Sequence, residues 1–400
     1  MNECVFNNQK SFSDKKAFYF LRARGHDYSN YARAKGIVKL IMLDFSDCVL
    51  VDFGVEYHGH SLSKNKVVAF FQLAFSQILN KARVKKWMKR TSANPDIIFS
   101  TFMAKSTMKY LKKYCAKKSI PLVCDYTEWN TADEKRLGRF SRSLRACQYA
   151  ITKWMDPSLN AVGISTYFTN YFSGKNINCI RLPNMLDCEK LTYMDNDSSK
   201  DRQLELLFVG NKNRIDFVNV LIDALASLTN DELSRVHTTI IGSDLSPKSK
   251  SPVNVKNLQK VSKNLSVFDR KPYSEFEKFY YRSDFSIFLL STKLLYAKAL
   301  FPTKMTDAFA HSRPVMSNLT TDLPLYLADG ENSLICKGDD ASALAETIRR
   351  GLKLTKTEKE KMNESAFKTI CSQFDYHCFR EPFVSFVKKA IFKEGGCYGK

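Results

Sequence analysis

The sequence lacks any hydrophobic run long enough to cross a membrane. Its longest apolar stretches, at residues 285–290 and 67–71, are far shorter than the roughly 20 residues that a membrane-spanning helix needs. Residues 1–16 are polar and charged, without the apolar segment of a secretory signal. Only 15 of the 400 residues are glycine and 11 are proline, which excludes collagen-like and low-complexity sequences. We therefore expect a globular, cytosolic protein.

Spacings typical of metal sites are also absent. The 11 cysteines include no Cys-x-x-Cys pair, and His58 and His60 have no second ligand pair near them. In a chain without a secretory signal, such cysteines are expected to be reduced thiols. The sequence therefore predicts no metal centre.

Acidic residues are scarce relative to basic ones. The chain has 62 Lys and Arg against 41 Asp and Glu, a net charge of +21 and a pI near 9.4. The excess is greatest in the first half, and no acid occurs in residues 97–124. Such a charge attracts nucleic acids, anionic lipids or phosphorylated substrates, although solvated helix faces also explain it. The densest cluster comprises Lys81, Arg83, Lys85, Lys86, Lys89 and Arg90.

Short apolar runs alternate with amphipathic segments along the whole chain, which predicts parallel sheets flanked by helices. The alternation lapses in the polar, turn-rich residues 186–202 and restarts at residue 204. We therefore expect an α/β protein with two domains, residues 1–190 and 203–375, and a C-terminal helix at about 376–395 that returns to the first domain. The expected strands are 17–21, 48–53, 96–100, 121–124, 161–164, 179–182, 204–209, 238–241, 265–268, 285–290, 315–317 and 334–336.

Two loops of the second domain have the composition of a phosphate site. One follows the expected strand 204–209, where Gly210 permits close backbone approach and Lys212 and Arg214 add positive charge ahead of a helix. An ordinary turn with solvated charges would explain this loop equally well. The glycine patterns of dinucleotide-binding proteins and of P-loop nucleoside triphosphatases are both absent.

The other loop begins a helix at Pro302, so that Thr303 and Lys304 lie at the positive end of its dipole. Asp307 follows one helical turn after Thr303 on the same face. A carboxylate there could accept hydrogen bonds from vicinal sugar hydroxyls, or could simply stabilise the helix dipole.

The order of motifs in residues 204–355 resembles the retaining glycosyltransferases of group 1, family 4, of the bacterial polysaccharide-assembly type. The family pattern Glu-Ala-x-Ala-x-Gly-x-Pro-Val is present at 307–315 with Asp307 for Glu and Ser312 for Gly. Residues 281–286, 301–304 and 327–334 are similar to other segments of that family. Ala299 stands where the family has the first Glu of its Glu-(seven residues)-Glu pattern.

The resemblance implies the GT-B fold, in which two Rossmann-like domains face each other across a cleft. It implies donor diphosphate contacts at Gly25, Gly210, Lys212, Arg214, Thr303 and Lys304, and nucleoside contacts at Asp307. Asp125 and Glu128 would be acceptor-side candidates for the catalytic carboxylate. The resemblance implies no metal or other cofactor, because cations replace the metal at the diphosphate.

The implied activity is that of a hexosyltransferase-type enzyme. It would move a sugar from a nucleotide-diphosphate sugar to a lipid-linked glycan in capsule or lipopolysaccharide biosynthesis, with retention of configuration. The basic cluster of residues 81–90, with Trp87, would then hold the enzyme peripherally on the anionic inner face of the cell membrane. Two alternatives stay open: a nucleotide-sugar epimerase of similar fold, and a basic nucleic-acid-binding protein, although no nucleic-acid-binding motif is visible.

Overall fold

The computed structural model divides into two compact units. Unit 1 comprises Met1–Leu186, Ala299–Phe301 and Tyr376–Lys400, and unit 2 comprises Asp187–Lys298 and Pro302–Asp375. No helix in the described part of the chain is both long enough and apolar enough to cross a membrane. The structure describes residues 10–21, 28–53, 66–91, 94–101, 105–127, 160–195, 203–211, 217–249, 251–272 and 275–392.

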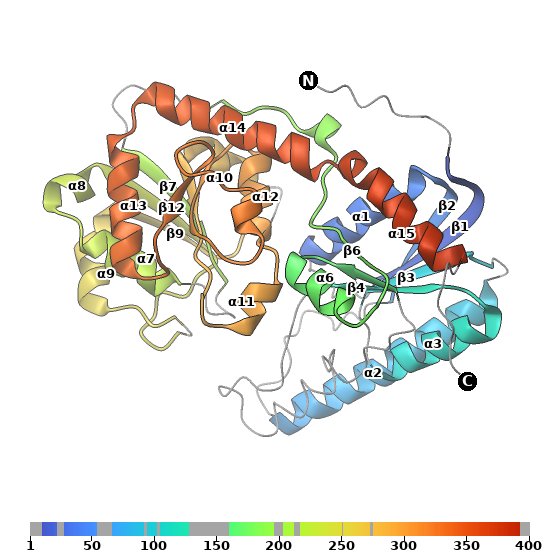
Figure 1. The fold of residues 1–400 in the computed structure, drawn as a ribbon. Helices are drawn as coiled ribbons and strands as arrows, with labels where there is room; N and C mark the ends of the chain where they lie inside the picture. The colour runs from blue at the N-terminus through green and yellow to red at the C-terminus, as the bar shows by residue number, and fades with distance from the viewer. Residues whose placement is uncertain are drawn as a thin grey trace. The chain divides into compact units, whose positions relative to one another are not determined.

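Unit 1 contains a six-stranded sheet in the order β2-β1-β3-β4-β5-β6, with every neighbouring pair parallel (Figure 1). The strands are β1 (Phe12–Leu21), β2 (Phe45–Asp52), β3 (Ile97–Thr101), β4 (Leu122–Tyr126), β5 (Asn160–Gly163) and β6 (Cys179–Arg181). The helices are α1 (Tyr28–Met42), α2 (Lys66–Arg90), α3 (Lys105–Lys118), α6 (Thr166–Ser173) and α15 (Arg380–Phe392).

The C-terminal helix α15 completes the core of unit 1. Its side chains Phe383, Phe386 and Val387 are buried in one cluster with residues of β1, β3 and α1. The Phe383 ring stacks on Phe99 of β3 at 5.9 Å between centroids. The apolar residues of α15 therefore belong to the core of the first sheet.

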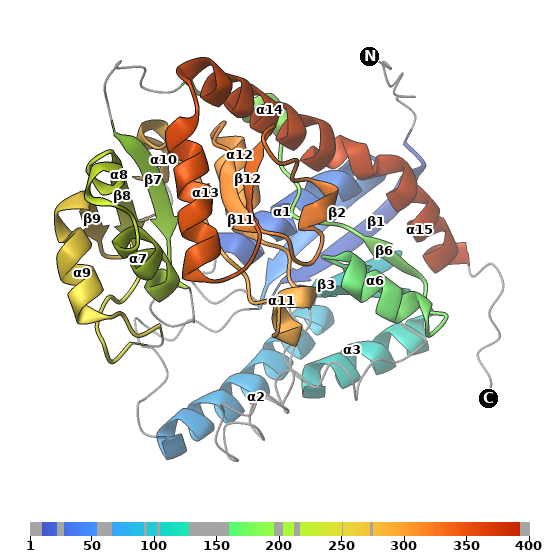
Figure 2. The same ribbon diagram turned by 60° about the vertical axis from the view of Figure 1, so that its left-hand side comes forward.

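Unit 2 contains a second parallel six-stranded sheet, in the order β12-β11-β10-β7-β8-β9 (Figure 2). Its strands are β7 (Leu204–Val209), β8 (Val236–Ile241), β9 (Leu265–Phe268), β10 (Phe285–Ile287), β11 (Val315–Asn318) and β12 (Ser333–Cys336). Its helices are α7 (Val218–Ala226), α8 (Asn230–Ser234), α9 (Val255–Val261), α10 (Phe276–Arg282), α11 (Leu295–Ala299, whose last residue groups with unit 1), α12 (Thr303–Ala310), α13 (Ala341–Lys353) and α14 (Lys356–Phe374).

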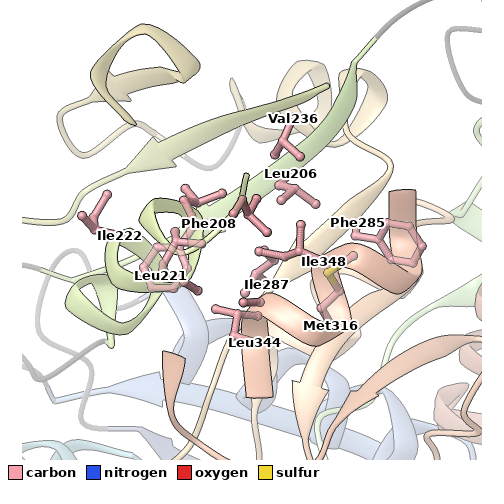
Figure 3. Packing of buried hydrophobic residues seen from close by; sticks show 14 of the residues in the cluster. Leu206, Phe208, Leu221, Ile222, Val236, Phe285, Ile287, Met316, Leu344 and Ile348 are labelled. Atoms are coloured by element: carbon pink, nitrogen blue, oxygen red, sulfur yellow. The ribbon is translucent and has the colours of Figure 1, made fainter. Parts of the chain in front are cut away.

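The core of unit 2 forms where α7 and α13 pack on the sheet. Figure 3 shows Leu206 and Phe208 of β7, Leu221 of α7, Ile287 of β10 and Ile348 of α13 in one cluster. All five side chains are at most 1% exposed. Because strands buried on both faces are nearly continuous apolar runs, the residues 204–209 were readable as a strand from the sequence.

Helix α6 is an element that the sequence analysis did not predict. Its sequence, TYFTNYFS, is rich in β-branched and aromatic residues, which are weak helix formers. Burial of Phe168 and Phe172 against Tyr126 of β4 stabilises it. Gly163, at the end of β5, permits this packing, because a Cβ there would lie 2.6 Å from the Cβ of Phe168.

Candidate functional site

The strand order of unit 2 determines where a ligand would bind. From β7 the chain first adds β8 and β9 on one side and then β10, β11 and β12 on the other. In open parallel sheets, ligands bind beyond the carboxyl ends of the strands, at the point where the strand order reverses. In this sheet that point lies between β7 and β10.

Two glycines bring the loops after β7 and β8 together at this edge. The amide of Gly210 donates to the carbonyl of Ile241 at 2.8 Å. Gly242 has a φ of +76°, and a Cβ there would lie 3.3 Å from the carbonyl oxygen of Gly210. Glycine is favoured at Gly242 by its left-handed backbone. The backbone is thus tightly packed beside the β7 end.

Helix α12 places Lys304 at the same edge. Met305, Ala308 and Phe309 are fully buried and fix the helix on unit 2. The Lys304 Nζ lies over the ring of Phe208, near the carboxyl end of β7, at 5.3 Å from the ring centroid. The Lys304 cation therefore lies beside Phe208, which precedes Gly210 by two residues. It is also at the N-terminal end of α12, where the helix dipole favours anions.

Asp307 lies three residues after Lys304 on α12 and is partly exposed. Its carbonyl oxygen accepts a 2.7 Å hydrogen bond from Nδ1 of His311. The His311 ring stacks on Tyr280, 4.5 Å between centroids, and its burial lowers the pKa of the imidazole. The neutral ring thus helps to end the helix that carries Lys304 and Asp307.

Polar residues that the sequence analysis missed hold the loop after β10. Asn318, only 2% exposed, accepts from the amide of Leu290 at 2.9 Å and donates to its carbonyl at 2.8 Å. One Asp339 oxygen accepts from the amide and the hydroxyl of Thr292, at 3.0 and 3.3 Å. The sequence signal for Asn318 is a polar residue at the end of a buried strand. This signal does not identify its partner, Leu290, which lies 28 residues earlier in the chain.

Ala299, at the place of the family's first Glu, is completely buried. Its carbonyl oxygen accepts a 2.6 Å hydrogen bond from the hydroxyl of Ser165, which is also buried. Alanine supplies no carboxylate at this position, and its carbonyl is held by Ser165 within unit 1.

Asp125, a catalytic candidate at the end of β4, is paired inside unit 1. Its side chain is 1% exposed, and Oδ1 lies 2.6 Å from Nη2 of Arg33. Oδ2 accepts from the hydroxyl of Tyr19 at 2.8 Å and from Nε of Arg33 at 3.0 Å. Burial, followed by the charge of Asp125, raises the pKa of Tyr19 well above its usual value. Both carboxylate oxygens are thus used in a buried network.

The basic cluster of residues 81–90 lies on α2. The structure exposes Arg83, Lys85, Lys86, Lys89 and Arg90, but Lys81 is half-buried. Trp87 of the same helix is half-buried, and its part in membrane attachment stays a prediction. Its ring packs edge-on against Phe18 and Phe20 of β1 and against Phe53, which follows β2, with centroid distances of 5.1, 5.5 and 6.1 Å.

Four candidate residues, Gly25, Glu128, Lys212 and Arg214, lie outside the described residues. Their roles stay predictions, as do the roles assigned to Asp125, Gly210, Thr303, Lys304 and Asp307. Within the described ranges, no group of three His, Cys, Asp or Glu side chains could hold a metal ion.

Comparison with known proteins gives one family match, which lies in unit 2. Residues 203–353 match the family model of Glycosyl transferases group 1. No curated protein sequence matches the chain. The resemblance to group 1 is thus confirmed for a segment that includes β7, Gly210 and all of α12.

Solved structures match almost the whole chain at low sequence identity. Sucrose-phosphate synthase from Thermosynechococcus elongatus matches with a TM-score of 0.64 and 11% identity, over 95% of this chain and 100% of its own. HepE from Anabaena, in complex with UDP and glucose, gives 0.59 and 12% over 94% and 100%. A glycosyltransferase from Rickettsia africae gives 0.60 and 14% over 98% and 100%. The expected GT-B type of α/β fold, with two parallel sheets, is thereby confirmed.

Proposed function

We propose that this protein is a glycosyltransferase that moves a sugar from a nucleotide-diphosphate sugar to a lipid-linked glycan, with retention of configuration and without a metal ion. The observation that carries the proposal is the position of Lys304. It lies at the start of α12 and over the end of β7, inside the segment that matches group 1 glycosyltransferases. Cell-surface polysaccharide biosynthesis, such as capsule or lipopolysaccharide assembly, is the proposed context.

The chemistry needs positive charge at this edge of the sheet. The bond between the anomeric carbon and the diphosphate breaks, so the leaving group gains negative charge in the transition state. Fixed cations and backbone N–H groups that contact this charge lower the barrier, because they bind the transition state more strongly than the ground state. Lys304, the first turn of α12 and the backbone at Gly210 would make these contacts, with Asp307 holding the ribose hydroxyls.

The carboxylate that contacts the acceptor would come from unit 1. Asp125 is engaged by Arg33 and Tyr19, which favours a role in positioning the end of β4. Glu128, two residues after β4, is the other acceptor-side candidate from the sequence. We assign no proton transfer to Asp125, since both of its oxygens already accept hydrogen bonds.

The first experiment is a thermal-shift screen of the full chain with nucleoside diphosphates, beginning with UDP because HepE binds it. A ligand that binds only the native state raises stability by RT ln(1+[L]/Kd), about 2.7 kcal/mol at 100 times Kd. Stabilisation by one nucleotide, unchanged by EDTA, is expected. Stabilisation by oligonucleotides alone would favour the nucleic-acid-binding alternative.

The second experiment incubates the protein with the stabilising nucleotide sugar and a lipid-linked glycan extract. Transfer of labelled sugar to the lipid fraction, with the anomeric configuration of the donor, is the expected product. A free epimer of the sugar without transfer would replace the proposal with the epimerase alternative.

A further inference from the structure

Three polar side chains, called here the Ser266 triad, form a hydrogen-bonded chain across three neighbouring strands of unit 2. Nδ1 of His237, on β8, lies 2.7 Å from Oε2 of Glu205 on β7. Nε2 of the same ring lies 3.0 Å from Oγ of Ser266 on β9. Glu205 and His237 are direct partners in the register of β7 and β8. The three side chains therefore lie on one face of the sheet.

The order of these contacts determines what each atom can do. An ionised carboxylate only accepts hydrogen bonds, so Nδ1 of His237 donates to Glu205. In the neutral imidazole, Nε2 is then the acceptor and takes the hydrogen bond of the Ser266 hydroxyl. A serine on Nε2 and a carboxylate on Nδ1 is the arrangement of a nucleophile, its base and the group that orients the base. The hydrogen bond with Glu205 also raises the pKa of His237, which makes the imidazole a stronger base.

The triad is held firmly at Glu205 and is open to solvent. The Glu205 amide donates to Oδ2 of Asp284 at 2.9 Å, and its carbonyl accepts from the Asp284 amide at 2.7 Å. The side chains of His237 and Glu205 are 24% and 25% exposed, and Ser266 is half-buried on the edge strand of the sheet. A small molecule therefore has access to an oriented base and its serine.

Aromatic rings lie next to Ser266 on the same face. Phe268 follows two residues later on β9, so it points to the same side of the sheet, and it is 37% exposed. Its ring centroid lies 5.3 Å from that of Phe279 on α10. A group bonded to Ser266 would lie beside these rings, which favours an apolar group. Glu205 precedes Gly210 by five residues of β7, about 16 Å at 3.3 Å per residue, so the triad is outside the proposed donor site.

We propose that Ser266 is a nucleophile that takes an apolar acyl group from an ester, with His237 as its base and Glu205 orienting the imidazole. Oγ attacks the carbonyl carbon while its proton passes to Nε2 of His237. The C–O bond of the ester then breaks, and the alcohol leaves with that proton. Water releases the acid by the same two steps, giving a proton to Nε2 that returns to Ser266. This activity goes beyond the proposed function and does not depend on it.

The test treats the full chain with an alkyl fluorophosphonate, which bonds to activated serines with loss of fluoride, and locates the adduct by mass spectrometry. One adduct, at Ser266, is expected on the parent chain, and none on Ser266→Ala. His237→Gln should slow the labelling at least about 100-fold, because it removes the general base. Glu205→Gln keeps the size of the side chain and should slow it at least about tenfold. Hydrolysis of p-nitrophenyl acetate should fall in the same three variants.

The matched control is Ser262→Ala, which removes a hydroxyl four residues before Ser266. Ser262 is exposed and donates to the carbonyl of Gln259 at 2.9 Å, so this variant should react as the parent does. The adduct is located on the parent chain itself, and urea unfolding shows which variants keep the fold. A folded parent without an adduct, an adduct at another residue, or equal labelling of the parent and folded His237→Gln would overturn the proposal. The triad would then be a cross-strand contact that only stabilises the sheet.

Discussion

Replacing Lys304 by methionine removes the proposed donor cation and keeps a side chain of similar length. Methionine keeps an unbranched apolar stem that can lie on the Phe208 ring, where the Lys304 Nζ is 5.3 Å from the centroid. Because Met305, Ala308 and Phe309 anchor α12 from its buried side, we expect the helix to stay in place. Loss of the cation–π contact should cost the free protein about 0.5–1 kcal/mol.

The effect on nucleotide binding should be larger than the effect on folding. A hydrogen bond to a charged group contributes about 1.5–3 kcal/mol. At about 1.4 kcal/mol per factor of ten, this corresponds to a Kd for the nucleoside diphosphate raised roughly 10- to 150-fold. Inorganic pyrophosphate should be weakened to a similar extent, because the lost contact is with the diphosphate.

Isothermal titration of parent and variant with UDP and with pyrophosphate gives both constants. The control is Lys263→Met, in which an exposed lysine just before β9 is changed at the amino end of the same sheet. Nucleotide affinity of Lys304→Met equal to that of the parent would refute the placement of the diphosphate at α12. Equal losses in Lys304→Met and Lys263→Met would show a general charge effect instead.

Three further variants test individual residues. Asp307→Ala should weaken UDP binding in the same titration and leave pyrophosphate binding intact, because it removes the contact with the nucleoside. Asp125→Asn should lower the free energy of unfolding in urea by about 3–5 kcal/mol, since it leaves the buried Arg33 charge uncompensated; a normal stability with lost activity would instead indicate a catalytic role. His237 forms a hydrogen bond with Glu205 that raises the pKa of the imidazole. This pair therefore stabilises the fold fully below about pH 6.5, the usual pKa of histidine, and less as pH rises through the higher pKa of the folded state. His237→Gln should abolish that part of the pH dependence in urea unfolding, and an unchanged profile would contradict the assignment.

The local parts of the fold were predictable from the sequence because local residues determine them. The run at 204–209 and the helix that begins after Pro302 have the bounds that periodicity and capping predict. Strand β1 begins at Phe12, whereas the sequence predicts a start at residue 17. The prediction is late because the residues after Phe12 are polar and interrupt the apolar run. Helix α6 was missed for the reason given above, since packing overrides its weak propensity.

Contacts between distant residues were not predictable from one sequence. Arg33 and Asp125 are 92 residues apart, and the residues around each of them in the sequence give no indication that the two form a pair. The same holds for Trp87, whose position among basic residues favoured an interfacial role. The rings of Phe18, Phe20 and Phe53, which the fold brings to it, determine its actual environment.

Asp307 and Asp125 are acidic site candidates that follow or end strands of parallel sheets, and the strand orders explain their different environments. In unit 2 the order reverses between β7 and β10, and α12 with its partly exposed Asp307 follows β10. In unit 1 it reverses between β1 and β3, whereas Asp125 is on β4, one strand beyond. A carboxylate on a strand away from the point where the strand order reverses is covered by the elements packed around that strand. Because it is buried, it needs a cation beside it. Arg33 supplies that cation and also donates to the carbonyls of Leu182 and Pro183 after β6. Asp125, through Tyr19 and Arg33, therefore connects β4 with β1, α1 and the segment after β6. These contacts are those of a residue that positions the carboxyl edge of the first sheet.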